Sequence, residues 1–91
     1  MKKQIIMTIS GRVQGVWFRK TVKDVAEEFG FVGYAKNKSD GCVEVLVCGN
    51  EKKFEEFIAL MKKGSKLSCV DNVEYEIHDE CGVEYSDFKI L

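Results

Sequence analysis

The segment from Gly11 to Arg19 carries the residues of this chain that are best suited to chemistry. It reads Gly-Arg-Val-Gln-Gly-Val-Trp-Phe-Arg and lies where a strand-like alternation passes into a helical pattern. Glycines at 11 and 15 free the main chain to adopt positive φ and to turn several N–H groups toward one point. The following helix adds unpaired N–H groups with a partial positive charge, and Arg19 adds a planar, permanently charged fork. These features predict a site for an oxyanion, with phosphate as the first choice.

The same glycines would also suit a tight turn that binds nothing, with Arg19 as an ordinary surface residue. A cation in the first turn of a helix opposes the helix dipole by about 0.3–1 kcal/mol, which favours the anion site. The segment is not a P-loop, because no Gly-Lys-Ser/Thr follows at the required spacing. ATP and GTP are therefore not expected as substrates.

Asn37 is the second candidate residue. It ends a strand pattern and precedes the Asp40-Gly41 pair, a strong hairpin signal. An asparagine amide both donates and accepts hydrogen bonds, so it can hold and orient a water molecule. The alternative is a turn asparagine that bonds only its own main chain.

No group suited to general acid or base catalysis stands out. His78 alternates out of an apolar strand pattern and is expected to face solvent, and Ser10 and Thr21 have no base nearby in the sequence. Hydrolysis of a carboxyl–phosphate anhydride needs no general acid, because its leaving group is a carboxylate with a conjugate-acid pKa of about 4. The protein then has only to hold the phosphoryl group, spread its charge and position a water. Further basic residues that could steer a dianion to the site are Arg12, Lys20, Lys36 and Lys38.

Composition limits the classes of function. The chain has 91 residues, enough for one domain over residues 1–91, and a net charge of −1, which argues against binding nucleic acid or membrane through bulk charge. The first ten residues alternate like a strand and lack a signal-peptide core, so we expect a cytoplasmic protein.

The cysteines show no Cys-x-x-Cys and only one histidine accompanies them, so no metal site is predicted and reduced thiols are expected. The four cysteines are Cys42, Cys48, Cys69 and Cys81, and the alternative to four reduced thiols is a disulfide between Cys69 and Cys81.

Periodicity predicts five strands and two helices. The helices carry apolar stripes beginning at Phe18 and Phe54 and end at Gly30 and Gly64. The strands are expected near residues 4–10, 31–37, 42–48, 72–78 and 88–90. We expect an α+β protein of the ferredoxin-like split β-α-β type: βαββαβ plus a short C-terminal strand, with an antiparallel sheet and two helices on one face.

Two blocks of the sequence resemble the signatures of the acylphosphatase family. The first is Gly11-Arg-Val-Gln-Gly-Val-x-Phe-Arg19, and the second is Gly33-Tyr-Ala-Lys-Asn-x-x-Asp-Gly-x-Val-Glu44. The similarity continues to the Phe88-x-Ile90 end, and the family fold is the split β-α-β sandwich. The resemblance implies an enzyme that hydrolyses the carboxyl–phosphate bond of small acyl phosphates to a carboxylate and inorganic phosphate, with water attacking phosphorus.

The resemblance also implies a role for each matched residue. Arg19 would bind the phosphate and Asn37 would orient the water, while a phosphate oxygen of the substrate accepts the water's proton. The main-chain phosphate cradle would be formed by Gly15, Val16, Trp17, Phe18 and Arg19. Trp17 stands where the family often has glycine, and its indole could contact the acyl group. We expect no metal or organic cofactor, inorganic phosphate or sulfate as a ligand of the site, and a monomer.

Two other functions remain as alternatives. RNA binding by the same topology would need aromatic residues on the open sheet face and a basic, phenylalanine-rich third strand, which reads Cys-Val-Glu-Val-Leu-Val-Cys here. A protein that binds acyl phosphate or carbamoyl phosphate without hydrolysing it would not need both Arg19 and Asn37.

Overall fold

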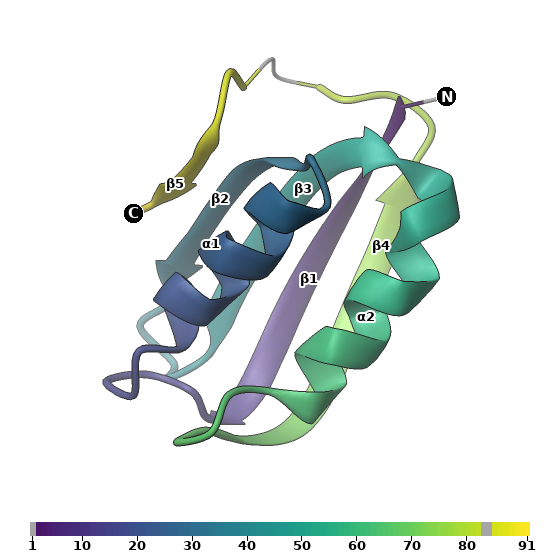
Figure 1. The fold of residues 1–91 in the computed structure, drawn as a ribbon. Coiled ribbons are helices and arrows are strands. Elements are labelled where there is room, and N and C mark those ends of the chain that lie inside the picture. The colour runs from purple at the N-terminus through teal and green to yellow at the C-terminus, as the bar shows by residue number, and fades with distance from the viewer. Residues whose placement is uncertain (1, 83–84) are drawn as a thin grey trace.

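The computed structural model describes residues 2–82 and 85–91. Within these residues the elements follow the predicted βαββαβ order, with a short strand at the end (Figure 1). They are β1 (Lys2–Arg12), α1 (Phe18–Glu28), β2 (Val32–Asn37), β3 (Val43–Asn50), the short 3₁₀ helix η1 (Glu51–Lys53), α2 (Phe54–Lys63), β4 (Cys69–His78) and β5 (Phe88–Ile90).

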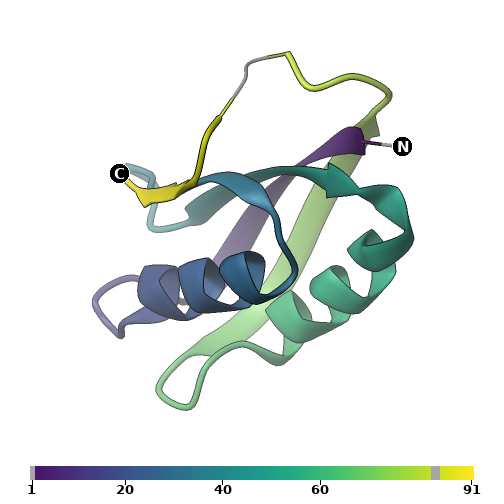
Figure 2. The same ribbon diagram turned by 45° about the horizontal axis from the view of Figure 1, so that its top comes forward.

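The strands form one five-stranded sheet in the order β4-β1-β3-β2-β5, and both helices cover the same face of it (Figure 2). The pairs β1–β3, β1–β4 and β2–β3 are antiparallel, as predicted. The last strand, β5, runs parallel to β2, with Phe88 opposite Gly33, so the whole sheet is mixed. β4 ends and β5 begins at the same end of the sheet, on opposite edges (Figure 1), so β5 runs in the same direction as β2. The predicted α+β class and the single helical layer are confirmed.

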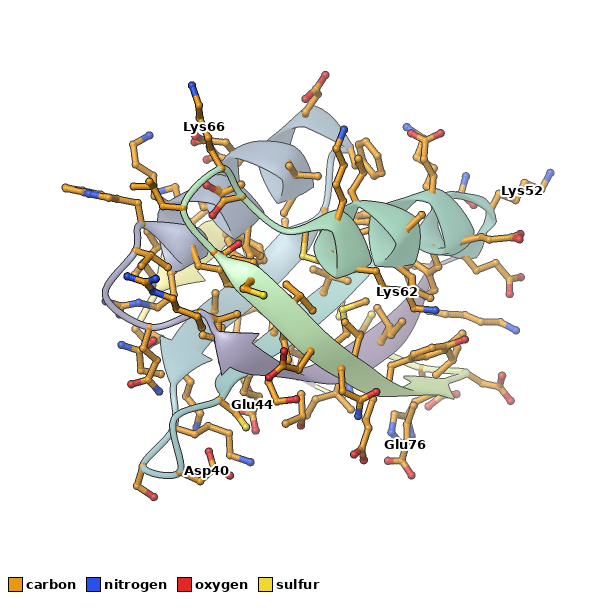
Figure 3. The ribbon with its side chains drawn as sticks, turned by 90° about the horizontal axis from the view of Figure 1, so that it is seen from below. Asp40, Glu44, Lys52, Lys62, Lys66 and Glu76 are labelled. Carbon is orange, nitrogen blue, oxygen red and sulfur yellow. The ribbon has the colours of Figure 1, made fainter. Side chains whose placement is uncertain are left out.

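The core lies between the sheet and the helices. Ile5, Met7 and Ile9 of β1 lie opposite Val47, Val45 and Val43 of β3, and all six side chains are fully buried. Successive side chains of a strand point to opposite faces, so the intervening residues line the open face. Figure 3 shows Glu44 and Glu76 on this open face, pointing away from the helices.

The helices bury the stripes that their periodicity predicts. In α2 the buried side chains are Phe54, Phe57, Ile58 and Met61, and in α1 they are Phe18, Val22 and Ala26. Phe31, which leads into β2, packs edge-on against two α2 rings, with centroid distances of 5.6 Å to Phe54 and 5.2 Å to Phe57. Edge-to-face pairs of this kind contribute about 0.5–1.5 kcal/mol beyond the buried area. This aromatic contact holds α2 against the start of β2.

The ends of the helices are also as predicted. Gly30, at φ 76°, closes α1 with two hydrogen bonds: its N–H donates to Glu27 O, and the N–H of Phe31 donates to Ala26 O. Gly64, at φ 73°, closes α2. Asn50 accepts a hydrogen bond from the N–H of Lys52 and so caps η1. The third strand, expected near residues 42–48, extends further, because Gly49 and Asn50 also pair with β1.

All four cysteines are free thiols. The Cys69–Cys81 disulfide considered above is ruled out by their places in the sheet. Cys69 pairs with Arg12 at one end of β1, whereas the Cys81 thiol donates to Lys3 O at the other. These two positions are nine residues apart along β1, roughly 30 Å.

Substituting Gly33 by alanine should destabilise the fold strongly. Gly33 has φ 146°, and a Cβ there would overlap the main-chain carbonyl of Leu46 on β3. The N–H of Gly33 also donates to Asp87 O at 3.0 Å, just before β5. We expect Gly33→Ala to lower the free energy of unfolding by about 2–4 kcal/mol, measured by urea denaturation.

Gly82→Ala is the matched control, because a Cβ at Gly82 meets nothing within 4 Å. A Gly33→Ala protein as stable as the control would show that the close approach of β2 to β3 is not rigid.

Candidate functional site

The loop between β1 and α1 has the backbone geometry of an anion cradle. Gly15 has φ 73°, and Trp17 has φ 63°, the single positive φ outside glycine in the described part of the chain. Left-handed geometry costs an aromatic residue of order 1–3 kcal/mol, so the surrounding structure must hold it. Val13 and Phe18, on either side, are buried in the core and hold the loop at both ends.

The N-terminus of α1 is left uncapped. Trp17 occupies the N-cap position without a side-chain hydrogen bond to the helix, and the first turn contains no acidic residue. Instead, Arg19 and Lys20 stand in that turn. The N–H and the hydroxyl of Thr21 both donate to Trp17 O, at 3.1 and 3.3 Å, which fixes the start of the helix. The first N–H groups of a helix have no acceptor within it, so this end is arranged to accept an anion from outside.

Arg19 is positioned by the last residue of the chain. Its Nη1 donates to Leu91 O at 2.7 Å, and the N–H of Leu91 donates to Ala35 O of β2 at 2.9 Å. Among the described residues, no Asp or Glu side chain pairs with Arg19. The guanidinium carries five N–H donors, so the bond to Leu91 orients it and leaves others for an anion.

Asn37 lies at the end of β2, paired with Val43, and is exposed. It is two residues beyond Ala35, so both lie on the helix-covered face, roughly 7 Å apart along the strand. Figures 1 and 2 both place the β1–α1 loop, the β2–β3 turn and the C-terminal end of β5 at the same end of the sheet. The fold therefore brings Asn37 to the end of the sheet where Leu91 holds Arg19.

Gln14 joins the loop to the β2–β3 turn, a role that the sequence analysis missed. Its Nε2 donates to Lys38 O and to Cys42 O, each at 2.8 Å. The turn is further closed by the N–H of Cys42, which donates to Asp40 Oδ1 at 3.0 Å and lowers the pKa of that carboxyl below its ordinary value. Asp40 stands at the tip of this turn (Figure 3). The sequence signal for this role was a side-chain amide with two N–H donors within the first signature. Its partners could not be predicted, because they are main-chain carbonyls, which no pattern of side chains reveals.

A cavity of about 490 Å³ opens beside the loop. Its walls combine apolar side chains from the loop and β5 with two cations, and they consist of Val13, Gly15, Trp17, Phe18, Arg19, Lys20 and Ile90. The Trp17 indole forms an exposed rim, with 74% of the residue open to solvent. Asn37 does not line this cavity. Among the predicted site residues, the cavity thus gathers Gly15, Trp17, Phe18 and Arg19, while Val16 packs partly buried against the core.

Only some of the basic residues considered above face the site. Lys20 lines the cavity and pairs with Asp24 at 3.2 Å. Lys36 lies next to Asn37 in sequence but points to the open face, where it pairs with Glu44 at 3.5 Å. The alternation of the strand separates these two neighbours, so Lys36 does not contribute to the cavity.

No group of three or more His, Cys, Asp or Glu side chains in residues 2–82 and 85–91 is placed to bind a metal ion. No helix in that part of the chain is long and apolar enough to cross a membrane.

Comparison with known proteins relates this chain to acylphosphatases. The acylphosphatase family model matches residues 5–90. An acylphosphatase from Caldanaerobacter subterraneus is 42% identical over 90 residues, 99% of each chain, and one from Legionella pneumophila is 49% identical over 73 residues, 78% of this chain and 80% of its own. The crystal structure of an acylphosphatase from Bacillus subtilis superposes with a TM-score of 0.92 at 32% identity, covering 98% of both chains.

Removing the Gln14 amide should loosen the site. Gln14→Ala removes two side-chain hydrogen bonds from carbonyls of the β2–β3 turn, which keep only their main-chain donors. At about 0.5–1.5 kcal/mol for each hydrogen bond, we expect a loss of about 1–3 kcal/mol in the free energy of unfolding, measured by urea denaturation. Ser10→Ala is the control, because Ser10 makes a single exposed bond of 3.4 Å to Asn72 O. Equal stability of the two variants would contradict a structural role for Gln14.

Proposed function

The chain belongs to the acylphosphatase family of enzymes, which act on acyl phosphates, and we propose that its β1–α1 loop and Asn37 hydrolyse small acyl phosphates. The products would be a carboxylate and inorganic phosphate. The proposal rests above all on one observation: the N-terminus of α1 has no cap and no acidic residue, yet holds Arg19 beside it. A helix start with only a structural role would be stabilised by a capping side chain and by acidic residues in its first turn.

In the proposed complex the phosphoryl group lies against the loop. Main-chain N–H groups from Gly15 to Arg19 and the guanidinium of Arg19 donate to its oxygens. The acyl group then extends into the cavity toward the apolar side chains of Trp17 and Ile90. Donors held in place before the substrate arrives need no reorganisation as charge shifts in the transition state.

The chemical step needs few groups. Asn37 orients a water that attacks phosphorus: the new P–O bond forms while the bond to the acyl oxygen breaks, and the carboxylate leaves unprotonated. The water's proton passes to a phosphate oxygen of the substrate. Positioning and electrostatic stabilisation supply most of the acceleration in phosphoryl transfer of this kind.

We also propose that the protein is a monomer and that inorganic phosphate binds to the cradle. Light scattering tests the first point, and competition by added phosphate tests the second.

Arg19→Ala should abolish most of the activity. With benzoyl phosphate and a chelator present, we expect kcat/KM to fall at least about 10²–10³-fold, as when one oxyanion donor is deleted from an enzyme. Inorganic phosphate, titrated by calorimetry, should also bind more weakly. Lys23→Ala, which removes a cation from the same helix but not from the cavity wall, is the control. A fully active Arg19→Ala enzyme would overturn the proposed site.

Asn37→Ala should separate catalysis from binding. Because Asn37 is proposed to handle water and not phosphate, kcat should drop by about 10²-fold or more while phosphate affinity stays within a few-fold of the original. Asn72→Ala, at an exposed position of β4, is the control and should leave both quantities unchanged. Weakened phosphate binding with an unchanged kcat would contradict the role proposed for Asn37.

Trp17 should influence the choice of acyl group. Trp17→Gly removes the rim and suits the φ of 63°, whereas Trp17→Phe retains an aromatic surface. We expect Trp17→Gly to reduce the kcat/KM ratio of benzoyl phosphate to acetyl phosphate by about 3–30-fold, the range that small changes of apolar contact produce. An identical ratio in all three proteins would show that the acyl group does not touch Trp17.

A further inference from the structure

Two cysteines meet at the end of the sheet opposite to the β1–α1 loop. Cys48, buried in β3, donates from Sγ to Gln4 Oε1 at 3.9 Å. The N–H of Gly82 donates to the same oxygen at 3.2 Å, and the thiol of Cys81 donates to Lys3 O at 3.5 Å. One side-chain oxygen of β1 therefore contacts both the Cys48 thiol and the residue that follows Cys81.

The sheet register explains this meeting. Cys48 pairs with Gln4, so both side chains lie on the open face, near the start of β1. After β4, the chain turns back toward the start of β1 (Figure 1), where the Cys81 thiol donates to Lys3 O. Both cysteines also line one cavity of about 380 Å³, together with Val32 and Tyr85. The cavity gives a small oxidant access and gives the side chains room to move.

The surroundings of Cys48 also affect its titration. Burial, and then the neighbouring Cys81 thiol, raise the pKa of Cys48 to about 12. A thiol with so high a pKa is a poor first nucleophile at neutral pH. Cys81 is less buried, so the first reaction is expected at Cys81 and the second at Cys48.

We propose that Cys48 and Cys81 form a modification site, at which a small peroxide converts the two thiols into an intramolecular disulfide. The thiolate of Cys81 attacks one peroxide oxygen: an S–O bond forms, the O–O bond breaks and hydroxide leaves, to be protonated to water. The Cys48 sulfur then attacks the Cys81 sulfur, an S–S bond replaces the S–O bond, and the departing hydroxide takes up the Cys48 proton. Two thiols and one hydrogen peroxide thus give one disulfide and two waters.

The link would join β3 to the segment that leads from β4 to β5. It would close a loop of 34 residues, from position 48 to position 81, which restricts the unfolded chain substantially. Because the β1–α1 loop lies at the opposite end of the sheet, the expected effect is on stability and not on the chemical step. This inference is independent of the proposed function.

Peroxide treatment of the reduced, full-length protein tests the proposal. A Cys42→Ser/Cys69→Ser variant retains only the proposed pair. About five equivalents of hydrogen peroxide should remove two thiols per chain, counted with a maleimide by mass spectrometry. Peptide mapping without reductant should show Cys48 linked to Cys81. The melting temperature should rise by at least about 5 °C and return to its starting value with dithiothreitol.

Two single variants show whether both thiols are needed. Cys81→Ser and Cys48→Ala, each with the other cysteines intact, should show no intramolecular link and no rise in melting temperature on oxidation. The proposal is overturned if the retained pair stays reduced, if it oxidises only to sulfinic acid, or if only disulfides between chains form.

Discussion

The hydrogen bond from Arg19 Nη1 to Leu91 O, 2.7 Å long, is the contact on which the geometry of the site depends. It joins the first turn of α1 to the end of the chain, 72 residues further on. Leu91 is itself fixed by its N–H, which donates to Ala35 O, and by the parallel pairing of β5 with β2. A cation on a long, flexible side chain is thereby held in one place before any ligand arrives, which reduces the entropy lost on binding.

The start of α1 departs from what helix stability alone would favour. It lacks a capping side chain and an acidic residue, and its N-cap residue is a tryptophan with positive φ. Each feature weakens the helix locally, by about 0.5–3 kcal/mol. The core offsets this because Val13 and Phe18, which flank the loop, are buried against the sheet. Natural proteins break local rules mainly where function requires it, and this helix start is where the proposed chemistry lies.

The two ends of the sheet are organised in a similar way by glutamines that hold the ends of strands together. At one end, Gln14 connects the β1–α1 loop to the β2–β3 turn. At the other, Gln4 accepts from Cys48 and from Gly82 and so holds the segment after β4 beside β3. Both contacts are side-chain bonds between parts of the chain that are distant in sequence. The candidate anion site and the two cysteines therefore lie at opposite ends of the sheet.

The sequence by itself determined the elements, the fold class and most of the residues of the candidate site. Alternating valines and isoleucines predict strands with one buried face. The apolar stripes of α1 and α2 must also be buried, and the apolar face of the sheet is the surface that can bury them. A layer of helices on one face of a sheet therefore follows from hydrophobic burial. The glycines and Arg19 indicated an anion loop because their chemistry is local. The tertiary structure alone decided which distant groups meet: the parallel β5, the anchoring of Arg19 by Leu91, the two bonds of Gln14 and the approach of Cys81 to Cys48. These contacts use main-chain atoms or depend on strand register, and neither leaves a periodic signal in the amino-acid sequence.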